Sequence, residues 1–362
     1  MTANITISLD AMGGDNAPGM VIDGAALARK RHPNLRFLLF GDEAVIAPLL
    51  SRHRALRDVV EVRHTDVQVS SNDRPSRALR HGRQSSMRLA INAVREGEAG
   101  GIVSAGNTGA LMAMSKFVFK TMPGIDRPAI CSFLPTLRGE SVMLDLGANV
   151  QCGQDNLVQF AIMGAAFART ILGLPLPTVG LLNVGEEEMK GNEAVKGAAA
   201  VLNQADLPLR FHGFIEGDDI AKGTTDVVVT DGFTGNVALK TVEGTATLFS
   251  QFLSTAFRQS TLSRLGYLLA KPSMKALRDR IDPRHHNGGV LLGLNGVSVK
   301  SHGGMDDVGF ATAIGLTADM VADDLIGRII ADMAHFSDSD DVTDDRPNDD
   351  RPDETEDRAV AR

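Results

Sequence analysis

Short apolar runs alternate with longer amphipathic segments along most of the chain. Strands are predicted at residues 5–9, 37–40, 59–62, 102–103, 141–146, 178–183 and 227–230. Helices are predicted at residues 19–31, 76–96, 110 onward, 155–172 and 193–204. This alternation is typical of an α/β fold with a largely parallel sheet covered by helices on both faces.

The hydrophobic pattern changes in residues 245–282. Leucines and phenylalanines recur at spacings of three and four among arginines and lysines, and no acidic residue lies between Glu243 and Asp279. We predict a pair of amphipathic helices that is broken near Pro272. Two interpretations remain open: helices that pack within the protein or a dimer, and helices that lie on an anionic membrane surface.

The C-terminal part predicts a strand pair, a closing helix and a tail. The strand pair is expected at residues 288–301, around Asn295 and Gly296, and the helix at residues 309–335. We therefore expect a single α/β domain over residues 1–336, with the amphipathic segment 245–282 within it. Residues 337–362 are rich in aspartate and poor in large apolar side chains, which predicts a disordered acidic tail.

Composition narrows the class of protein. The formal net charge is −8, and the tail holds 11 acidic and 4 basic residues, which leaves about −1 on the domain. One tyrosine and no tryptophan argue against base stacking, so no nucleic acid is expected as a partner. Two cysteines exclude a disulfide framework and a four-thiolate zinc site, and we expect neither a metal nor a cofactor. No signal peptide or membrane-spanning run is evident, which predicts a cytoplasmic protein.

The turn at residues 104–109 is the first candidate for chemistry. Ile102 and Val103 predict a strand that ends here, and residues from Ala110 onward predict the start of a helix. Unpaired N–H groups at a helix N-terminus favour an anion, and glycines let a ligand approach the backbone. Residues 230–240 repeat the order of strand, glycine-rich turn and helix. Two anion sites and one shared site are both consistent with this repetition.

Other polar clusters also follow predicted strands, where parallel sheets gather ligands. They are DAMGGD at 10–15, LDLGAN at 144–149, VGEEEMKGN at 184–192 and KSHGG at 300–304. A basic group forms either a positive rim for an anionic substrate or acidic partner protein, or a solvated face; it comprises Arg74, Arg77, Arg80, His81, Arg83 and Arg88. The nicotinamide fingerprint GxGxxG, the GxSxG elbow and HExxH are absent.

Taken together, the ordered motifs resemble one family. They are DAMGGD at 10–15, SSM at 85–87, SAGNTGALM at 104–112, LDLGANV at 144–150, LLNVGEE at 181–187, TDGFTGNVALKT at 230–241 and KSHG at 300–303. Over residues 5–335 the chain is similar to the bacterial phosphate acyltransferase (PlsX) family, the acyl-ACP:phosphate transacylases. It departs where relatives carry a lysine pair before Ser-Ser-Met, because residues 81–84 are His-Gly-Arg-Gln here. The acidic tail extends beyond the core of the family.

The resemblance implies a fold and a reaction. The fold would be three-layer α/β/α and Rossmann-like, similar to isocitrate/isopropylmalate dehydrogenases and phosphotransacetylases, with an amphipathic helical protrusion. The reaction would move a long-chain acyl group from acyl carrier protein to inorganic phosphate. The acyl phosphate would feed a downstream glycerol-3-phosphate acyltransferase in phospholipid synthesis. A homodimer that associates peripherally with the membrane is also implied.

This chemistry needs no covalent nucleophile from the protein. Phosphate is itself a nucleophile, and a thiol with a pKa of about 8.5 leaves as a thiolate. The predicted catalytic residues are Asn107, Lys190, Asn236, Lys300 and His302. The predicted substrate-binding residues are Asp10, Gly13, Gly14, Gly106, Thr108, Gly109, Asp145, Asn149, Glu186, Asp231, Gly232, Phe233, Gly235 and Lys240. Two alternatives remain: a phosphotransacetylase-like enzyme acting on short acyl-CoA, and a non-catalytic scaffold for membrane or carrier protein.

Overall fold

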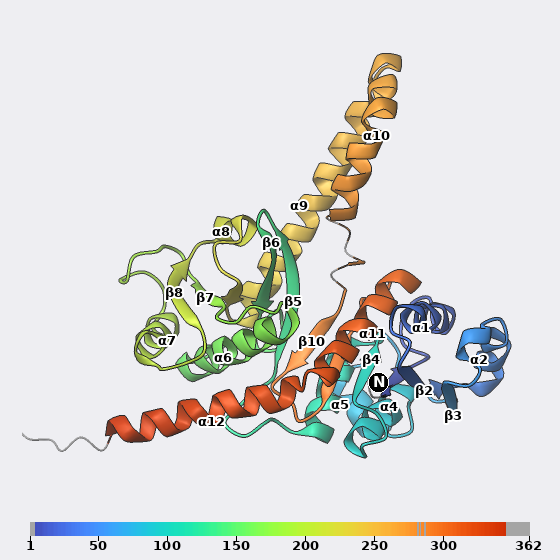
Figure 1. The fold of residues 1–362 in the computed structure, drawn as a ribbon, viewed down its shortest axis with the longest axis horizontal. Helices are drawn as coiled ribbons and strands as arrows, with labels where there is room; N and C mark the ends of the chain where they lie inside the picture. The colour runs from blue at the N-terminus through green and yellow to red at the C-terminus, as the bar shows by residue number, and fades with distance from the viewer. Residues whose placement is uncertain (1–3, 281, 283, 286, 345–362) are drawn as a thin grey trace, which may run out of the picture.

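An 11-stranded sheet runs through the molecule (Figure 1). The structure is a computed structural model that describes residues 4–280, 282, 284, 285 and 287–344. In spatial order the strands are β3 (Val60–His64), β2 (Leu35–Gly41), β1 (Ile5–Asp10), β4 (Gly101–Ser104), β11 (Val297–Lys300), β10 (Gly289–Leu292), β5 (Ala129–Thr136), β6 (Gly139–Leu144), β9 (Val227–Val229), β7 (Thr178–Leu182) and β8 (Arg210–Ile215).

The sheet consists of two parallel blocks that run in opposite directions. In the first block β3, β2, β1, β4 and β11 are parallel, and in the second β6, β9, β7 and β8 are parallel. Between the blocks, β11 pairs with β10, β10 with β5 and β5 with β6, each time antiparallel. Three reversals invert the strand direction, so the carboxyl ends of the two blocks leave the sheet at opposite edges. The expectation of a largely parallel sheet is confirmed.

Helices flank both faces of this sheet. They are α1 (Gly19–Arg31), α2 (Glu43–Leu50), η1 (Arg54–Leu56), α3 (Pro75–His81), α4 (Ser86–Arg95), α5 (Thr108–Phe119), α6 (Gln154–Ile171), α7 (Glu193–Gln204), α8 (Gly217–Lys222), α9 (Gly232–Arg258), α10 (Thr261–Arg280), α11 (Asp307–Ala322) and α12 (Leu325–Asp344). Successive strand residues point to opposite faces. Phe37 of β2 accordingly packs into the core with residues of α1 and α11, and Leu38 packs into the core with residues of α4 and α5.

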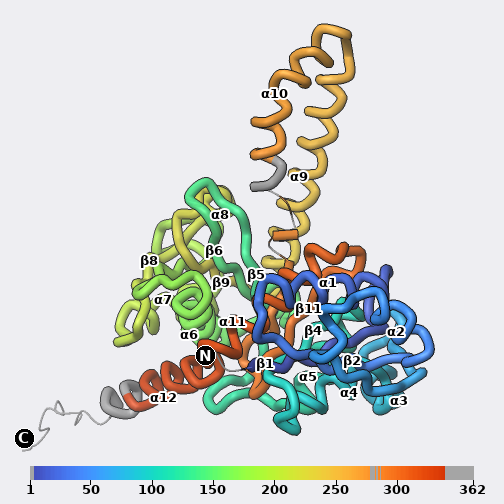
Figure 2. The backbone as a smooth tube through the Cα atoms, turned by 45° about the vertical axis from the view of Figure 1, so that its right-hand side comes forward, coloured from blue at the N-terminus to red at the C-terminus, as the bar shows by residue number. Residues whose placement is uncertain are grey.

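α9 and α10 form a helical hairpin that projects from the body of the molecule (Figures 1 and 2). Only Gly232 and Gly235 of α9 are buried. The rings of Phe257 and Tyr267 lie 5.2 Å apart and join the two helices. The exposed large apolar side chains of the hairpin are Phe233, Val237, Val242, Leu248, Phe249, Phe252, Leu262, Leu265, Tyr267, Leu268, Leu269 and Leu277. Exposed apolar surface of this extent marks an interaction site.

The predicted break near Pro272 is wrong. Pro272 lies inside α10, and the chain reverses at residues 259–260, where Ser260 Oγ accepts the N–H of Ser263 at 3.0 Å. A proline removes one helical N–H donor. The carbonyl that loses this donor belongs to Leu268, which is exposed, so water can replace the missing partner.

Two other predicted helices are each divided in two. The segment 76–96 forms α3 and α4, because Ser85 caps α4 by accepting the N–H of Arg88. The segment 309–335 forms α11 and α12, with Asp324 at φ 48° between them. α12 continues to Asp344, past the predicted domain boundary at residue 336, and Met333 anchors it in the core. Residues 345–362 of the predicted tail lie outside the described residues.

None of the helices that the structure describes is long and apolar enough to cross a membrane.

Candidate functional site

The first candidate site lies where β1, β4 and β11 end, and we call Asp10, Ser86, Ser104, Gly106 and Lys300 the β1 cluster. Asp10 is 1% exposed; it accepts the hydroxyl of Ser86 at 2.6 Å and that of Ser104 at 2.7 Å. Burial raises the pKa of the Asp10 carboxyl, and the two hydroxyl donors oppose this rise. Ser104 Oγ also accepts the N–H of Gly106 at 3.1 Å. The carboxyl group thereby orders the glycine-rich turn.

Lys300 brings a positive charge into the β1 cluster. Its Nζ donates to the carbonyls of Ala105 and Ser301. Burial lowers the pKa of Lys300 to about 8, while the nearby carboxylates of Asp10 and Asp15 act in the opposite direction. An anion beside this ammonium would stabilise its charged form, so the cluster is suited to bind one.

Close backbone contacts hold the turns of the β1 cluster together. A Cβ on Gly13 would lie 2.4 Å from Asp10 Oδ2 and 2.8 Å from the nitrogen of Gly106. The N–H of Asp15 donates to the carbonyl of Gly303 at 2.9 Å, which joins the turn after β1 to the turn after β11. Gly14, at φ 111°, occupies the left-handed region that favours glycine. The structure thus brings the predicted residues of three separate motifs to one place.

Asn107 occupies a structural position in this cluster. Its Oδ1 accepts the N–H of Ala110 at 3.0 Å and so caps α5. Its Nδ2 donates to the carbonyls of Ser70, Ser71 and Asp73. Both ends of the side chain are therefore engaged by the backbone, which favours a positioning role. The first-turn N–H groups of Thr108 and Gly109 are those that a helix leaves without an intrahelical acceptor.

His302 lies at the rim of the β1 cluster. Its side chain is exposed, and its Nδ1 accepts the N–H of Gly304 at 3.2 Å, which leaves Nε2 for another partner. Buried Asn287 holds this segment by accepting the N–H of His302 at 3.0 Å and donating to Ser301 Oγ at 2.8 Å. No sequence pattern points to Asn287, since it stands in no recognisable motif.

The second candidate site lies where β6, β9 and β7 end, and we call Asp145, Asn149, Asp231, Gly235 and Asn236 the β6 cluster. Asp145 is fully buried, and burial raises the pKa of its carboxyl while hydrogen bonds lower it. The carboxyl group accepts backbone N–H groups from Ile130, Gly147, Ala148 and Asn149, and the side-chain amide of Asn149. Asp145 thus fixes the loop of residues 146–149, as a residue that orients others would.

The N-terminus of α9 closes the β6 cluster. Asp231 caps the helix by accepting the N–H of Thr234 at 2.9 Å, and Asn236 Nδ2 donates to the carbonyl of Leu146 at 3.3 Å. A Cβ on Gly235 would lie only 1.9 Å from the carbonyl oxygen of Asp145. The N–H of Gly232 donates to Asn149, so Phe233 carries the first-turn N–H that stays available to a ligand.

The remaining predicted residues lie at the edge of the β6 cluster or beyond it. Glu186 and Lys190 are exposed in the loop after β7, and β7 neighbours β9 in the sheet. Lys240 lies two turns along α9 and pairs with Glu243 at 2.7 Å. This ion pair on an exposed helix surface fits a local contact better than a ligand contact.

The two clusters lie at opposite edges of the central strands β11, β10, β5 and β6. Leu144 and Val299 belong to one cross-strand row, which passes through Cys131 and Val290. Asp145 and Lys300 each follow this row by one residue, in opposite directions. Three strand spacings and two residue rises place their backbones about 16 Å apart.

Neither cysteine lies in an environment that activates a thiol. Cys131 is buried, which raises its pKa well above the ordinary value, and burial raises the pKa of Cys152 to about 11. The negative charge of Asp145 adds to both shifts. Both thiols therefore stay protonated near neutral pH, in agreement with a packing role.

Comparisons with known proteins place the chain in a family. The sequence model of the family described as "Fatty acid synthesis protein" matches residues 5–328. A phosphate acyltransferase of Rhodospirillum rubrum is 60% identical over 321 residues, which cover 89% of this chain and 92% of the relative. A phosphate acyltransferase of Parvibaculum lavamentivorans is 58% identical over 338 residues, which cover 93% of this chain and 94% of the relative.

Solved structures support the fold. An EutD phosphotransacetylase from Staphylococcus aureus aligns with a TM-score of 0.58 at 17% identity, over 88% of this chain and 94% of that one. A 4-hydroxythreonine-4-phosphate dehydrogenase from Klebsiella pneumoniae aligns with a TM-score of 0.52 at 15% identity, over 89% and 99%. The fold is thus of the Rossmann-type class that phosphotransacylases and such dehydrogenases share. The chain belongs to the phosphate acyltransferase family, a family of enzymes, as its motifs predicted.

The low pKa of Lys300 predicts a pH dependence of phosphate use. As the pH rises through about 8, the Lys300 ammonium loses its proton, so the apparent KM for phosphate should rise. Lys300→Arg keeps the charge and should move this rise to higher pH. Steady-state kinetics of both proteins between pH 6.5 and 9.5 measure the shift, and identical profiles would contradict the role of Lys300.

Loss of folding does not explain this expected pH effect. The folded pKa of about 8 lies below the ordinary value of 10.5, so between these values the unfolded chain binds more protons. The contribution of Lys300 to the free energy of unfolding therefore increases with pH in this window. A thermal melt at each pH serves as the control.

Proposed function

We propose that the chain transfers a long-chain fatty acyl group from acyl carrier protein to inorganic phosphate. The products would be acyl phosphate and free carrier protein, and a glycerol-3-phosphate acyltransferase would consume the acyl phosphate. The observation that carries the proposal is the course of α9. Its N-terminus closes the β6 cluster, and its exposed apolar side chains continue from Phe233 and Val237 outward along the hairpin. One helix thus joins an anion-binding turn to a surface suited to an acyl chain.

The proposed reaction balances without a cofactor. A phosphate oxygen attacks the thioester carbonyl carbon, the C–O bond forms, and the carbonyl oxygen becomes an oxyanion. When the carbonyl re-forms, the C–S bond breaks and the carrier leaves as a thiolate, which takes a proton from water. The protein must position the phosphate and stabilise the oxyanion.

We assign the phosphate to the β1 cluster and the thioester carbonyl to the β6 cluster. Because an attacking oxygen must come within about 3–3.5 Å of the carbonyl carbon, this assignment requires the loops of the two clusters to close toward each other. Lys300 and the first-turn N–H groups of Thr108 and Gly109 supply positive charge and donors for phosphate. The N–H of Phe233 and the amide of Asn236 supply donors for the oxyanion, and Lys190 adds positive charge from the loop after β7. Asp145 and Asp231 hold the turns, and His302 lies where a proton can pass to solvent.

Two rival functions fit the same chain less well. A phosphotransacetylase acting on short acyl-CoA would use both glycine-rich turns but would not need the apolar side chains of the hairpin. A scaffold for membrane or carrier protein would use the hairpin but not the buried Asp10 and Lys300. Phosphate-dependent hydroxamate formation, measured after subtracting the direct reaction of hydroxylamine with each thioester in phosphate-free samples, distinguishes all three. We expect palmitoyl hydroxamate from palmitoyl carrier protein plus phosphate, and far less product from acetyl-CoA plus phosphate.

The proposal includes a homodimer at the cytoplasmic membrane surface. Leu265 and Leu269 are 55% and 78% exposed on α10 and are followed by Lys271 and Lys275. Leucines can enter the interface of an anionic bilayer while lysines meet its headgroups, and each leucine contributes about 1.5–3 kcal/mol when fully buried.

If α10 contacts the membrane through Leu265 and Leu269, charged substitutions at these positions should reduce liposome binding. Leu265→Glu with Leu269→Glu should lower flotation with anionic liposomes by at least tenfold, because each change removes apolar area and adds negative charge. Leu176→Glu alters a leucine that is 56% exposed outside the hairpin and serves as the control. Unchanged flotation of the double variant would exclude the hairpin as the membrane contact.

A further inference from the structure

A continuous basic surface lies on α3, α4 and the segment between them. We call it the arginine surface and define it by Arg74, Arg77, Arg80, Arg83, Arg88 and Arg95. Residues 74–95 contain no aspartate or glutamate. Arg95 pairs with Glu96 at 2.9 Å, and among the described residues no ion pair is formed by the other five arginines, none of which either candidate cluster uses.

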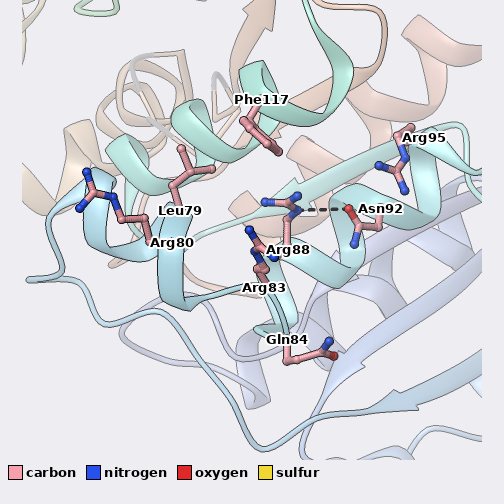
Figure 3. A pocket seen from close by; sticks show the side chains of 8 residues that line it. All are labelled: Leu79, Arg80, Arg83, Gln84, Arg88, Asn92, Arg95 and Phe117. Carbon is pink, nitrogen blue, oxygen red and sulfur yellow. Dashed lines mark hydrogen bonds between the residues drawn. The ribbon is translucent and has the colours of Figure 1, made fainter.

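Two adjoining hollows shape this surface. One has a volume of about 540 Å³ and is lined by Arg80, Arg83, Arg88 and Arg95 together with Leu79 and Phe117 (Figure 3). The other has a volume of about 520 Å³, and its lining includes Arg74, Arg77 and Arg80. Because Arg80 lines both, the hollows form one surface that extends over two helices.

Arg88 shows that the surface suits an anionic partner. Its side chain is 8% exposed, its Nε donates to Asn92 at 3.2 Å, and its guanidinium lies 5.2 Å from the centre of the Phe117 ring. Among the described residues no carboxylate forms an ion pair with it. Burial lowers the pKa of Arg88, and the charges of Arg95 and Arg83 lower it further. A buried cation among like charges is stabilised by an external anion.

The surface has the composition of a protein–protein contact. Phe117 is 51% exposed between Arg88 and Lys120, whose Nζ lies 4.9 Å from the ring centre. Arginine and aromatic side chains dominate the binding energy of protein interfaces. A surface that spans both α3 and α4 is also longer than a small phosphate-bearing ligand needs, since α4 alone measures about 15 Å.

The surface lies directly beside the β1 cluster. Ser86, in the first turn of α4, donates to Asp10. Asn107, which caps α5, holds residues 70–73, the segment that leads into α3. A protein bound to α3 and α4 would therefore lie at the entrance to the reacting groups.

We propose that the arginine surface is the docking site of the carrier protein, which binds it through an acidic face and so brings its thioester toward the phosphate in the adjacent β1 cluster. This inference rests on the proposed function. Arginines make bidentate contacts with carboxylates, and charge complementarity speeds encounter and fixes orientation. The exposed ring of Phe117 supplies an apolar contact within the basic surroundings.

The test is the affinity of fluorescently labelled acyl carrier protein, measured by anisotropy. Arg80→Glu with Arg83→Glu reverses two exposed charges and should weaken binding at least tenfold at low salt. Arg57→Glu changes an exposed arginine directly after η1, which packs against α1 on the opposite face of the sheet, and should have little effect. Equal affinity of the double variant and the parent protein would overturn the proposal.

Kinetics separate docking from chemistry. The double variant should raise the KM for palmitoyl carrier protein at least tenfold, with kcat and the KM for phosphate within twofold of the parent. A fall in kcat without a change in that KM would also overturn the proposal. If the parent binds carrier protein through this surface but forms no acyl phosphate, the docking inference stands and the proposed function fails.

Discussion

Gly235→Ala should lower kcat by at least a hundredfold. The added Cβ would lie 1.9 Å from the carbonyl oxygen of Asp145, and a contact that short forces backbone to move. The backbone that must move carries the first turn of α9, including the N–H of Phe233 and the amide of Asn236. Removing one oxyanion donor typically costs about 10²–10³ in rate, and this substitution displaces two.

Gly244→Ala is the matched control for this substitution. Gly244 lies on the same helix, and a Cβ there would meet nothing within 4 Å. Alanine should stabilise an exposed helix position by up to about 1 kcal/mol, so this variant should keep full activity. Turnover and urea unfolding of both variants decide the question. If Gly235→Ala folds and retains near-normal kcat, the N-terminus of α9 does not contribute to catalysis.

Lys300→Met should lower kcat/KM for phosphate by about 10²–10³, because methionine keeps the apolar stem and removes the positive charge from the β1 cluster. The unfolding free energy should not fall in parallel, since burial already disfavours the charged form of Lys300. A loss of kcat/KM without a matching loss of unfolding free energy distinguishes a catalytic role of Lys300 from a structural one.

Lys30→Met, on the exposed end of α1, removes an equal charge outside both clusters and should be nearly neutral. A loss of stability in Lys300→Met that matches its loss of activity would instead assign Lys300 to the structure alone. Lys300→Arg should recover part of the activity, because it restores the positive charge.

The sequence predicted the turns of the two clusters better than their arrangement. Local patterns identify a strand, a glycine-rich turn and a helix start; in the structure Gly106 lies in such a turn, and Gly235 lies in the first turn of α9. The opposite directions of the two parallel blocks depend on β5 and β10, which pair across long sequence separations. The sequence pattern does not predict β5, because Ser132 and Pro135 interrupt its apolar residues. The placement of the two clusters at opposite edges of the central strands could therefore not be predicted.

The roles of individual side chains also could not be predicted from local sequence patterns. The sequence predicts a catalytic role for Asn107, and it could not predict that the amide donates to the carbonyls of Ser70, Ser71 and Asp73, because these segments are distant in sequence. Ser86 and Ser104 were not selected as site residues, although both donate to Asp10. The sequence shows small hydroxyl side chains near the ends of strands. Only the buried position of Asp10 in the structure shows that they act as its hydrogen-bond donors.

The most direct measurement of the central claim is the yield of acyl phosphate from a carrier-bound substrate. The full chain is incubated with palmitoyl carrier protein and inorganic phosphate, and ³¹P NMR follows palmitoyl phosphate while a thiol reagent follows free carrier protein. We predict that the two products form in a one-to-one ratio, and that neither forms without phosphate. Thiol release that is independent of phosphate, or the absence of palmitoyl phosphate with folded protein, would contradict the claim.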